Sequence, residues 1–137
     1  MSQTSLTKPK SILSWVFQVL AAVILLQTLF FKFTGAPESV YIFEQLGMEP
    51  LGRYASGVAE LIASLLLLIP ALSWVGALLA LGVMGGAIAS HLIVLGVVVQ
   101  DDGGALFAMA LLVTLSCLVV LYLRRGQLME FLARLKR

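Results

Sequence analysis

Four long apolar runs constrain this chain more than any other feature of its sequence. They cover approximately residues 12–31, 54–72, 74–99 and 105–123. Each run reaches the roughly 20 residues that a helix needs to cross about 30 Å of hydrocarbon at about 1.5 Å per residue. A helix buried in a soluble protein rarely remains apolar on all sides over such a length. The sequence therefore predicts an all-α integral membrane protein, built as a four-helix transmembrane bundle.

The amount and position of charge agree with this prediction. Only 12% of the 137 residues are charged, whereas soluble domains average about 25%. Positive charge is enriched in cytoplasmic segments. Seven of the nine Lys and Arg residues flank the first and last runs, on the side that both termini share: Lys8, Lys10, Arg124, Arg125, Arg134, Lys136 and Arg137. We therefore expect both termini to be cytoplasmic, the lipid bilayer to be the main partner, and the net charge of +2 to reflect topology and not nucleic-acid binding.

Two amphipathic segments lie outside the apolar runs. In the loop 32–53, PESVYIFEQLG begins with Pro37 and ends with Gly47, residues typical of the first turn and the end of a helix. Its apolar residues recur at helical spacing, which predicts a short helix on the outer surface. The C-terminal segment combines an apolar stripe with basic side chains and predicts a helix on the anionic inner leaflet. The expected organisation is a polar N-terminal segment (1–11), a membrane domain (12–123) and a basic amphipathic helix (124–137).

Glu60 needs a particular explanation, because it interrupts the stretch SGVAELIASLLLLIP, which is otherwise apolar or small. A charged side chain at the centre of a membrane helix costs roughly 2.5–3.5 kcal/mol on insertion scales, and such residues normally face the interior of a bundle. The second and third runs cross in opposite directions. Glu60 and His91 therefore reach similar depths, about six and about nine residues below the outer boundary. We expect them to converge in the outer half of the bundle.

The first run contributes further polar side chains at the same level. Gln27 and Thr28 lie in its outer third, and Lys32 lies at its outer end. Side chains of this kind either bind a ligand and exchange protons with it, or connect helices by hydrogen bonds and an ion pair. The candidates for ligand binding or proton exchange are Glu60, His91, Lys32 and Gln27. The candidates to cover the mouth of the site are Tyr41 and Arg53. No catalytic residue can be assigned.

Small residues and the single cysteine limit other possibilities. Gly82 and Gly86 form a G-x-x-x-G pair, which lets a neighbouring helix approach closely, either within the chain or in a homodimer. Cys117 is the only cysteine, so an intramolecular disulfide and a cysteine zinc cluster are excluded, and we expect it to be a small buried packing residue. His91 and Glu60 supply only two plausible protein ligands, so no metal centre is expected.

Polar residues and glycines also occur at distinctive positions in the stretch FKFTGAPESVYIFEQLGMEPLGRYASGVAELIASLLLLIP. A lysine leaves the first run, a surface helix ends in LG, and G-x-x-E follows in the second run; these positions are Lys32, Gly57 and Glu60. With MGGAIASHLIV further on, the pattern resembles the DoxX family of small bacterial four-helix membrane proteins. The resemblance implies a bacterial inner-membrane location. It also implies quinone chemistry, since relatives are linked to a terminal quinol oxidase and to thiosulfate:quinone oxidoreduction. Gly57 then joins Gly82 and Gly86 as an expected helix-packing position.

Three functions remain open at this stage, and whether the chain is an enzyme is not decided. The first is a redox-associated subunit that binds a small lipophilic ligand, such as a quinone, in the outer half of the bundle. The second is a non-catalytic assembly factor or scaffold, which would have other membrane subunits or a second copy as partners. The third is a carrier or proton conductor, which is weakened because runs two and three are apolar below Glu60 and His91. We expect the first.

Overall fold

The computed structural model describes residues 6–136, and every regular element among them is a helix. The elements are α1 (Lys8–Thr34), α2 (Pro37–Gln45), α3 (Leu51–Leu67), the 3-10 turn η1 (Pro70–Leu72), α4 (Ser73–Ser90), the π-helical turn η2 (His91–Leu95), α5 (Ala105–Leu123) and α6 (Arg125–Leu135). Three segments are long and apolar enough to cross a membrane: Lys8–Thr34, Pro70–Leu95 and Ala105–Leu123. Residues 1–5 and 137, which belong to the predicted terminal segments, lie outside the described residues.

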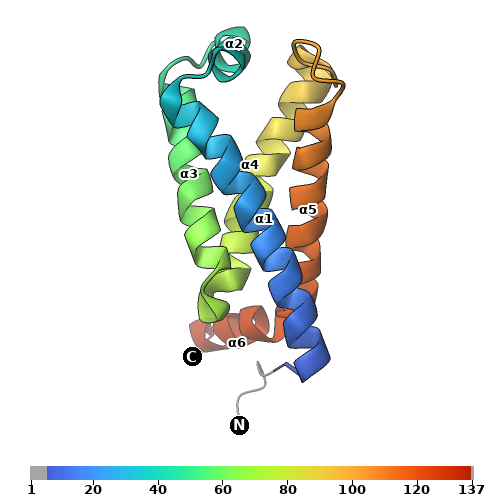
Figure 1. The fold of residues 1–137 in the computed structure, drawn as a ribbon. Helices are drawn as coiled ribbons and strands as arrows, with labels where there is room; N and C mark the ends of the chain where they lie inside the picture. Colours follow the sequence, from blue (N-terminus) through green and yellow to red (C-terminus); the bar gives the residue numbers. More distant parts are fainter. Residues whose placement is uncertain (1–5, 137) are drawn as a thin grey trace.

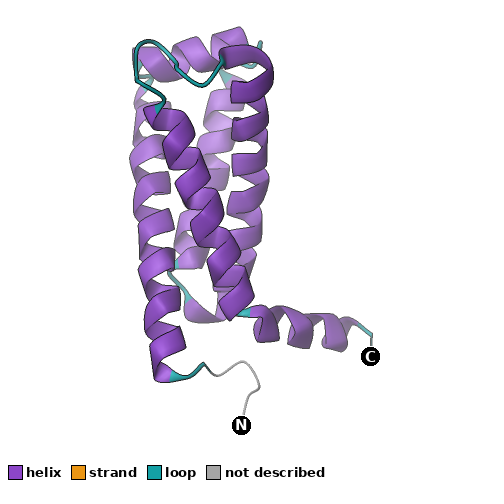
Figure 2. Cartoon of the chain, turned by 90° about the vertical axis from the view of Figure 1, so that its right-hand side faces the viewer, coloured by secondary structure: helices purple, strands orange, loops and turns teal. Residues whose placement is uncertain are grey.

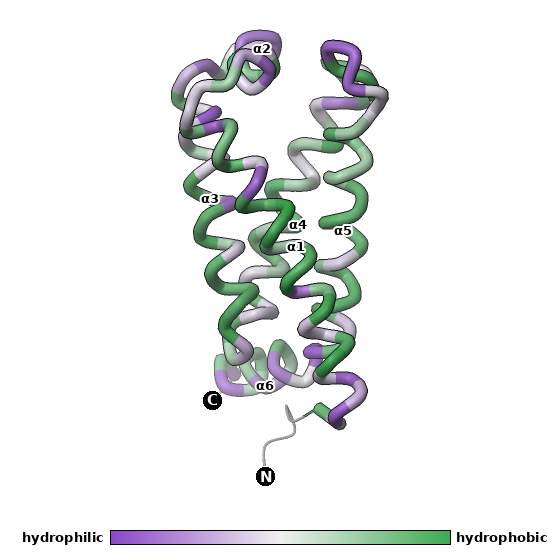
Figure 3. Tube along the Cα trace, viewed as in Figure 1, coloured by the Kyte–Doolittle hydropathy of each residue, from purple (hydrophilic) through white to green (hydrophobic). Residues whose placement is uncertain are grey.

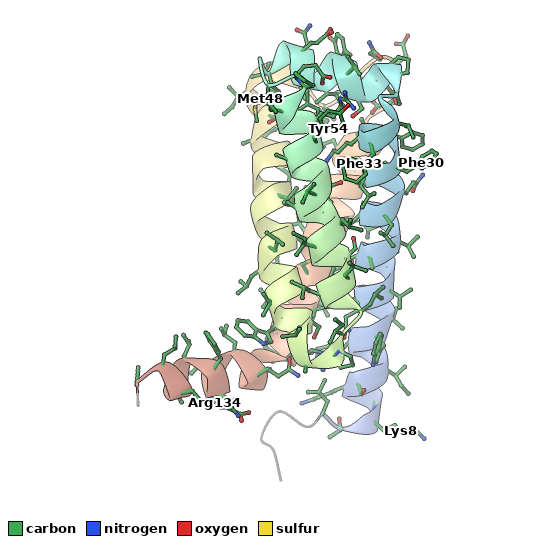
Figure 4. All side chains as sticks on the ribbon, turned by 90° about the vertical axis from the view of Figure 1, so that its left-hand side faces the viewer. Lys8, Phe30, Phe33, Met48, Tyr54 and Arg134 are labelled. Atoms are coloured by element: carbon green, nitrogen blue, oxygen red, sulfur yellow. The ribbon has the colours of Figure 1, made fainter. Side chains whose placement is uncertain are left out.

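The long helices α1, α3, α4 and α5 lie side by side, and each contacts two of the others (Figure 1). α1 contacts α3, α3 contacts α4, α4 contacts α5, and α5 contacts α1, so the four helices form a closed ring. The short helix α2 lies across one end of this group, and α6 projects sideways at the opposite end (Figure 2). We call these the α2 end and the α6 end. Met48 and Tyr54 lie at the α2 end, whereas Lys8 and Arg134 lie at the α6 end (Figure 4).

The distribution of apolar side chains indicates that the long helices are embedded in lipid. Hydrophobic residues dominate the long helices over most of their length, and hydrophilic residues gather at the two ends (Figure 3). Some apolar side chains fill the centre, including Leu25, Leu67 and Val113. Others face outward and remain exposed, such as Val23 and Leu115. Soluble proteins rarely expose apolar surface on this scale, so these outward faces fit a hydrocarbon environment.

The observed helix ends differ from the predicted spans in three of four cases. Only α5 coincides with its predicted span, 105–123. α1 is longer than 12–31 and begins at Lys8, inside the segment 1–11 that was expected to be polar and outside the membrane domain. α3 ends at Leu67 and not near 72, because Pro70 has no N–H to continue the helix and starts η1 instead. The third span leaves α-helical geometry after Ser90 and ends at Leu95, where Gly96 turns the chain at φ +79°.

Gly76 is the glycine at which α4 closely approaches α3. A Cβ placed there would lie 2.6 Å from the backbone nitrogen of Leu67 and 2.8 Å from the carbonyl oxygen of Ala63. A Cβ at Gly82 or Gly86 would meet nothing within 4 Å. Gly82 and Gly86 are therefore not points of close approach between helices of this chain, and their role in packing against a second copy stays a prediction. A G-x-x-x-G spacing identifies a face of small residues but does not say what that face meets.

This contact leads to a first testable prediction. We expect Gly76→Ala to lower the free energy of unfolding by about 1–3 kcal/mol, because the added methyl would have to displace the backbone of α3. Gly85→Ala is the matched control on the same helix, since a Cβ there meets nothing within 4 Å and alanine favours a helix over glycine. The measurement is unfolding of both purified proteins in detergent, followed by circular dichroism. Equal stability of the two variants would contradict the prediction.

Candidate functional site

A cavity of about 490 Å³ lies in the half of the helix group nearer the α2 end. Residues of α1, α2, α3, α4, η2 and α5 line it, and Figure 1 shows the long helices separating toward this end. Its wall is mostly apolar and includes three methionines, Met48, Met84 and Met109. Binding sites for small molecules typically enclose about 300–1,000 Å³ and combine apolar walls with a few polar groups. The cavity therefore has the size and surface of a small-molecule site.

Glu60 of α3 lies on the wall of this cavity and is only 1% exposed. Its Oε1 forms an ion pair with Lys32 Nζ, and Thr28 Oγ1 donates to Oε2 over 3.1 Å. Thr28 and Lys32 are one helical turn apart on α1, so both reach the same neighbour. Removing a carboxylate from water is costly unless it is paired and hydrogen-bonded. Here both carboxylate oxygens have partners, so Glu60 connects α1 to α3.

Contacts from the first turn of α3 and from α2 hold the Lys32 end of α1 in place. The carbonyl oxygen of Lys32 accepts a hydrogen bond from Arg53 Nη1. The same guanidinium binds the Glu49 carboxylate through Nε, at 2.9 and 3.0 Å from the two oxygens. The Lys32 ammonium also lies 5.8 Å from the centre of the Phe43 ring on α2. The end of α1 is thus fixed by both neighbouring segments, which limits how far Lys32 can move from Glu60.

Gly57 provides the space beside this ion pair. A Cβ at this position would lie 2.7 Å from Cε1 of Phe33, and Figure 4 shows Phe33 near the top of α1. Phe33 follows Lys32 directly in the sequence, so a shift of Phe33 would also affect the backbone at Lys32. Gly57 lies one helical turn before Glu60 on α3. A larger residue at Gly57 would therefore displace the Phe33 ring beside the site.

His91 lies on the wall of the same cavity but does not bind Glu60. It begins the π-helical turn η2, and its Nδ1 lies 2.9 Å from the carbonyl oxygen of Gly96. The Gly96 N–H in turn donates to the carbonyl oxygen of His91 over 2.7 Å. Within residues 6–136, no hydrogen bond joins His91 to Glu60. Glu60 and His91 therefore line the same cavity, as their similar depths suggested, but they are not hydrogen-bonded to each other. The depth expected for His91 was too large, because the helix ends at Leu95.

The remaining candidates have different positions. Gln27 lines the cavity, but its side chain is exposed and Thr28 takes the place next to Glu60. Tyr41 and Arg53 are not among the residues that line the cavity. Thr28 could have been chosen from the sequence, because it is the polar residue four positions before Lys32 on the same helical face.

Asp102 is a further cavity residue, and the sequence analysis did not select it as a site candidate. Its Oδ1 accepts hydrogen bonds from the backbone N–H groups of Val99 and Gly104 at 3.0 and 2.8 Å, and Oδ2 accepts one from Leu106 at 3.2 Å. Partial burial raises the pKa of Asp102, but these three donors outweigh it and leave the pKa below its usual range. Asp102 thus fixes the loop before α5 and stays charged at neutral pH.

A second buried polar cluster, at the α6 end, was missed in the sequence. Arg124 was taken as an interfacial cation, yet it is only 5% exposed. Its Nε donates to Ser14 Oγ over 2.8 Å and to Gln18 Oε1 over 3.0 Å, and Gln18 Nε2 donates to the carbonyl oxygen of Leu67 over 2.6 Å. Ser14 and Gln18 are one turn apart in an apolar run. That spacing was the available signal for a polar contact at this end.

Comparison with known proteins gives one match. The family model described as DoxX-like family matches residues 16–120. This range runs from the first third of α1 to near the end of α5, and it includes Lys32, Glu60 and His91. Searches of curated proteins and of solved structures each returned no match. Because the family match covers well over half of the chain and the long helices are apolar enough to enter a bilayer, the chain is a membrane protein that belongs to the DoxX-like family.

Proposed function

We propose that this DoxX-like protein binds a small lipophilic ligand in the cavity at the α2 end. The observation that carries the proposal is the combination of a mostly apolar cavity of about 490 Å³ with a buried, internally paired Glu60 on its wall. Ionisable residues inside membrane helices are costly and usually mark functional sites. An apolar wall with a few oriented polar groups is the surface that an amphiphilic small molecule would match.

The proposed arrangement in the membrane follows from helix length and charge. α1, α4 with its flanking turns, and α5 are each long enough to cross. α3 has 17 residues, about 26 Å at about 1.5 Å per residue, and crosses with them to complete a four-helix transmembrane bundle. The basic residues around α6 support a cytoplasmic position for the α6 end and both termini, and the family resemblance suggests the inner membrane of a bacterium. α2 and α6 then lie along the outer and inner surfaces, and the cavity lies in the outer half.

The residues on the cavity wall define what the site does. Glu60 and Thr28 hold the Lys32 ammonium at the wall, where its remaining N–H groups can donate to a ligand. His91 and Gln27 add further polar atoms around the same space. A quinone is the ligand that the family resemblance suggests, and the chain would then serve as a redox-associated subunit of a larger membrane complex.

A pair of glycine variants tests whether the cavity is the binding site. Gly86 lines the cavity and Gly85 does not, yet a Cβ at either position meets nothing within 4 Å. We expect Gly86→Leu to fill part of the cavity without a backbone clash, and Gly85→Leu to add a side chain outside it. In mass spectrometry of organic extracts from the gently purified proteins, wild type and Gly85→Leu should carry a stoichiometric lipophile. Gly86→Leu should have lost most of it.

Two results would count against the proposal. Full retention of the lipophile in Gly86→Leu would place the bound molecule outside the cavity. No lipophile in any of the three proteins, with all three folded by circular dichroism, would remove ligand binding as the function. In that case the assembly-factor alternative would become the better explanation, and the Glu60–Lys32 pair would be a structural link between helices.

A further inference from the structure

The hydrogen bonds of His91 determine which of its ring nitrogens carries a proton. A carbonyl oxygen can only accept, so the 2.9 Å contact with the Gly96 oxygen requires a proton on Nδ1. In the neutral imidazole, Nε2 is then an acceptor with a free lone pair. The reciprocal bond from the Gly96 N–H and the edge contact with Phe107, at 5.4 Å between ring centres, hold the ring in this orientation.

Nε2 of His91 is available to a ligand. It has no hydrogen-bond partner in the described part of the chain. Among residues 6–136, Gln127 Oε1 is the one fully covered side-chain polar atom without a partner, so Nε2 is not sealed within protein. His91 lines the cavity and is only 5% exposed, and binding of a ligand by Nε2 requires that Nε2 faces this cavity.

The charged groups around the cavity disfavour a negative ligand. Its lining contains one ammonium, Lys32, and three carboxylates, those of Glu38, Glu60 and Asp102. Lys32 is already paired with Glu60, and the carboxylate of Asp102 is held by three backbone N–H groups. The lining therefore has an excess of negative charge and of acceptor atoms. An anion would be repelled here, whereas a neutral donor would find an open acceptor.

We propose that the cavity selects uncharged amphiphiles whose polar end is a hydroxyl, as in an alcohol or a phenol, and that His91 Nε2 accepts the hydroxyl proton. The inference rests on the proposed function, because it names the ligand class for that same site. The apolar body of the ligand lies against the wall formed by Leu25, Met84, Met109 and Val113.

Three photoreactive probes with the same ten-carbon chain and the same diazirine position test this selectivity. The first ends in a hydroxyl, the second in the methyl ether of that hydroxyl, and the third in a sulfonate. Labelling is measured on purified protein in detergent and mapped by mass spectrometry. Labelling is counted as specific when it is lost in Gly86→Leu and retained in Gly85→Leu. We expect the hydroxyl probe to label cavity residues at about tenfold lower concentration than the ether, and the sulfonate to label least.

Two substitutions at His91 assign the preference to Nε2. His91→Asn keeps an N–H near the position of Nδ1 and lacks the far acceptor, so the hydroxyl and ether probes should label it equally. His91→Gln extends an amide oxygen toward the position of Nε2 and should restore part of the preference. Equal labelling of wild type by the hydroxyl and ether probes, stronger labelling by the sulfonate, or an unchanged preference in His91→Asn would overturn the inference and leave ligand binding intact. The absence of any label that Gly86→Leu blocks would overturn the proposed function itself.

Discussion

Lys32→Met is expected to destabilise the protein by about 3 kcal/mol, more than Glu60→Gln does, although the two residues form one ion pair. Breaking a buried pair leaves an uncompensated charge, which typically costs about 3–5 kcal/mol. The two partners are not equally buried, since the side chain of Glu60 is 2% exposed and that of Lys32 is 17% exposed. A carboxylate left alone is trapped between helices. A lysine left alone at the end of α1 can extend toward water.

The double variant Lys32→Met with Glu60→Gln completes a thermodynamic cycle. Because it removes both charges, we expect it to be more stable than Lys32→Met alone, which would show coupling between the two side chains. The measurement is unfolding of purified protein in mixed micelles by increasing SDS. Lys10→Met is the matched control, as it makes the same chemical change at an exposed position of the same helix. Additive effects, or a larger loss for Glu60→Gln than for Lys32→Met, would contradict the prediction.

The second large effect is expected at the opposite end, where Arg124→Met should cost about 3 kcal/mol. The substitution removes the one Nε–H that Ser14 Oγ and Gln18 Oε1 share, a hydrogen bond from a charged donor worth about 1.5–3 kcal/mol. It also leaves the buried Ser14 oxygen without that donor, whereas Gln18 Oε1 keeps the hydrogen bond from Ser14 Oγ. Arg124→Lys should recover only part of the loss, because an ammonium cannot reproduce the planar fork of donors. Arg124 Nη1 also donates to the carbonyl oxygen of Pro70 over 3.4 Å, so α6 should loosen as well.

Arg125→Met is the control for this prediction. Arg125 is the next residue along the chain, but it is exposed, with its guanidinium over the Tyr122 ring and one N–H donated to the Tyr122 carbonyl oxygen. Contacts of this kind on the surface contribute little to stability. We expect a small change in unfolding for Arg125→Met, and faster hydrogen exchange across residues 125–135 only for Arg124→Met. Equal losses for the two arginines would show that the polar cluster does not stabilise the fold.

The sequence predicted the elements whose signal is length and apolarity, and it was less successful where geometry decides. The predicted span 105–123 coincides with α5 because charged and turn residues border it on both sides. The span 74–99 was too long because Val97, Val98 and Val99 are as apolar in a loop as in a helix. Hydropathy reports where a residue can lie, but backbone conformation is set locally, here by Gly96 at positive φ.

The same limit applies to the polar residues. A cost for burying Glu60 could be stated from the sequence, and Lys32 was a natural partner on the neighbouring helix. Arg124 could not be separated from Arg125, because a count of basic residues near a helix end does not say which one turns inward. Gly82 and Gly86 have the spacing of a packing face, yet it is Gly76 that α3 approaches. Which side of a helix meets a neighbour depends on the packing of all the helices together.

The methionines on the cavity wall bear on how the site would treat molecules of different shape. Met48, Met84 and Met109 have unbranched thioether side chains with several rotatable bonds, and such side chains rearrange at little cost to fill irregular space. Such side chains adjust to the shape of a bound apolar group. The site would therefore discriminate poorly between straight, branched and ring-containing hydrocarbon groups. In a series of compounds, affinity would then be ranked by the polar end, and changes to the hydrocarbon part would be tolerated.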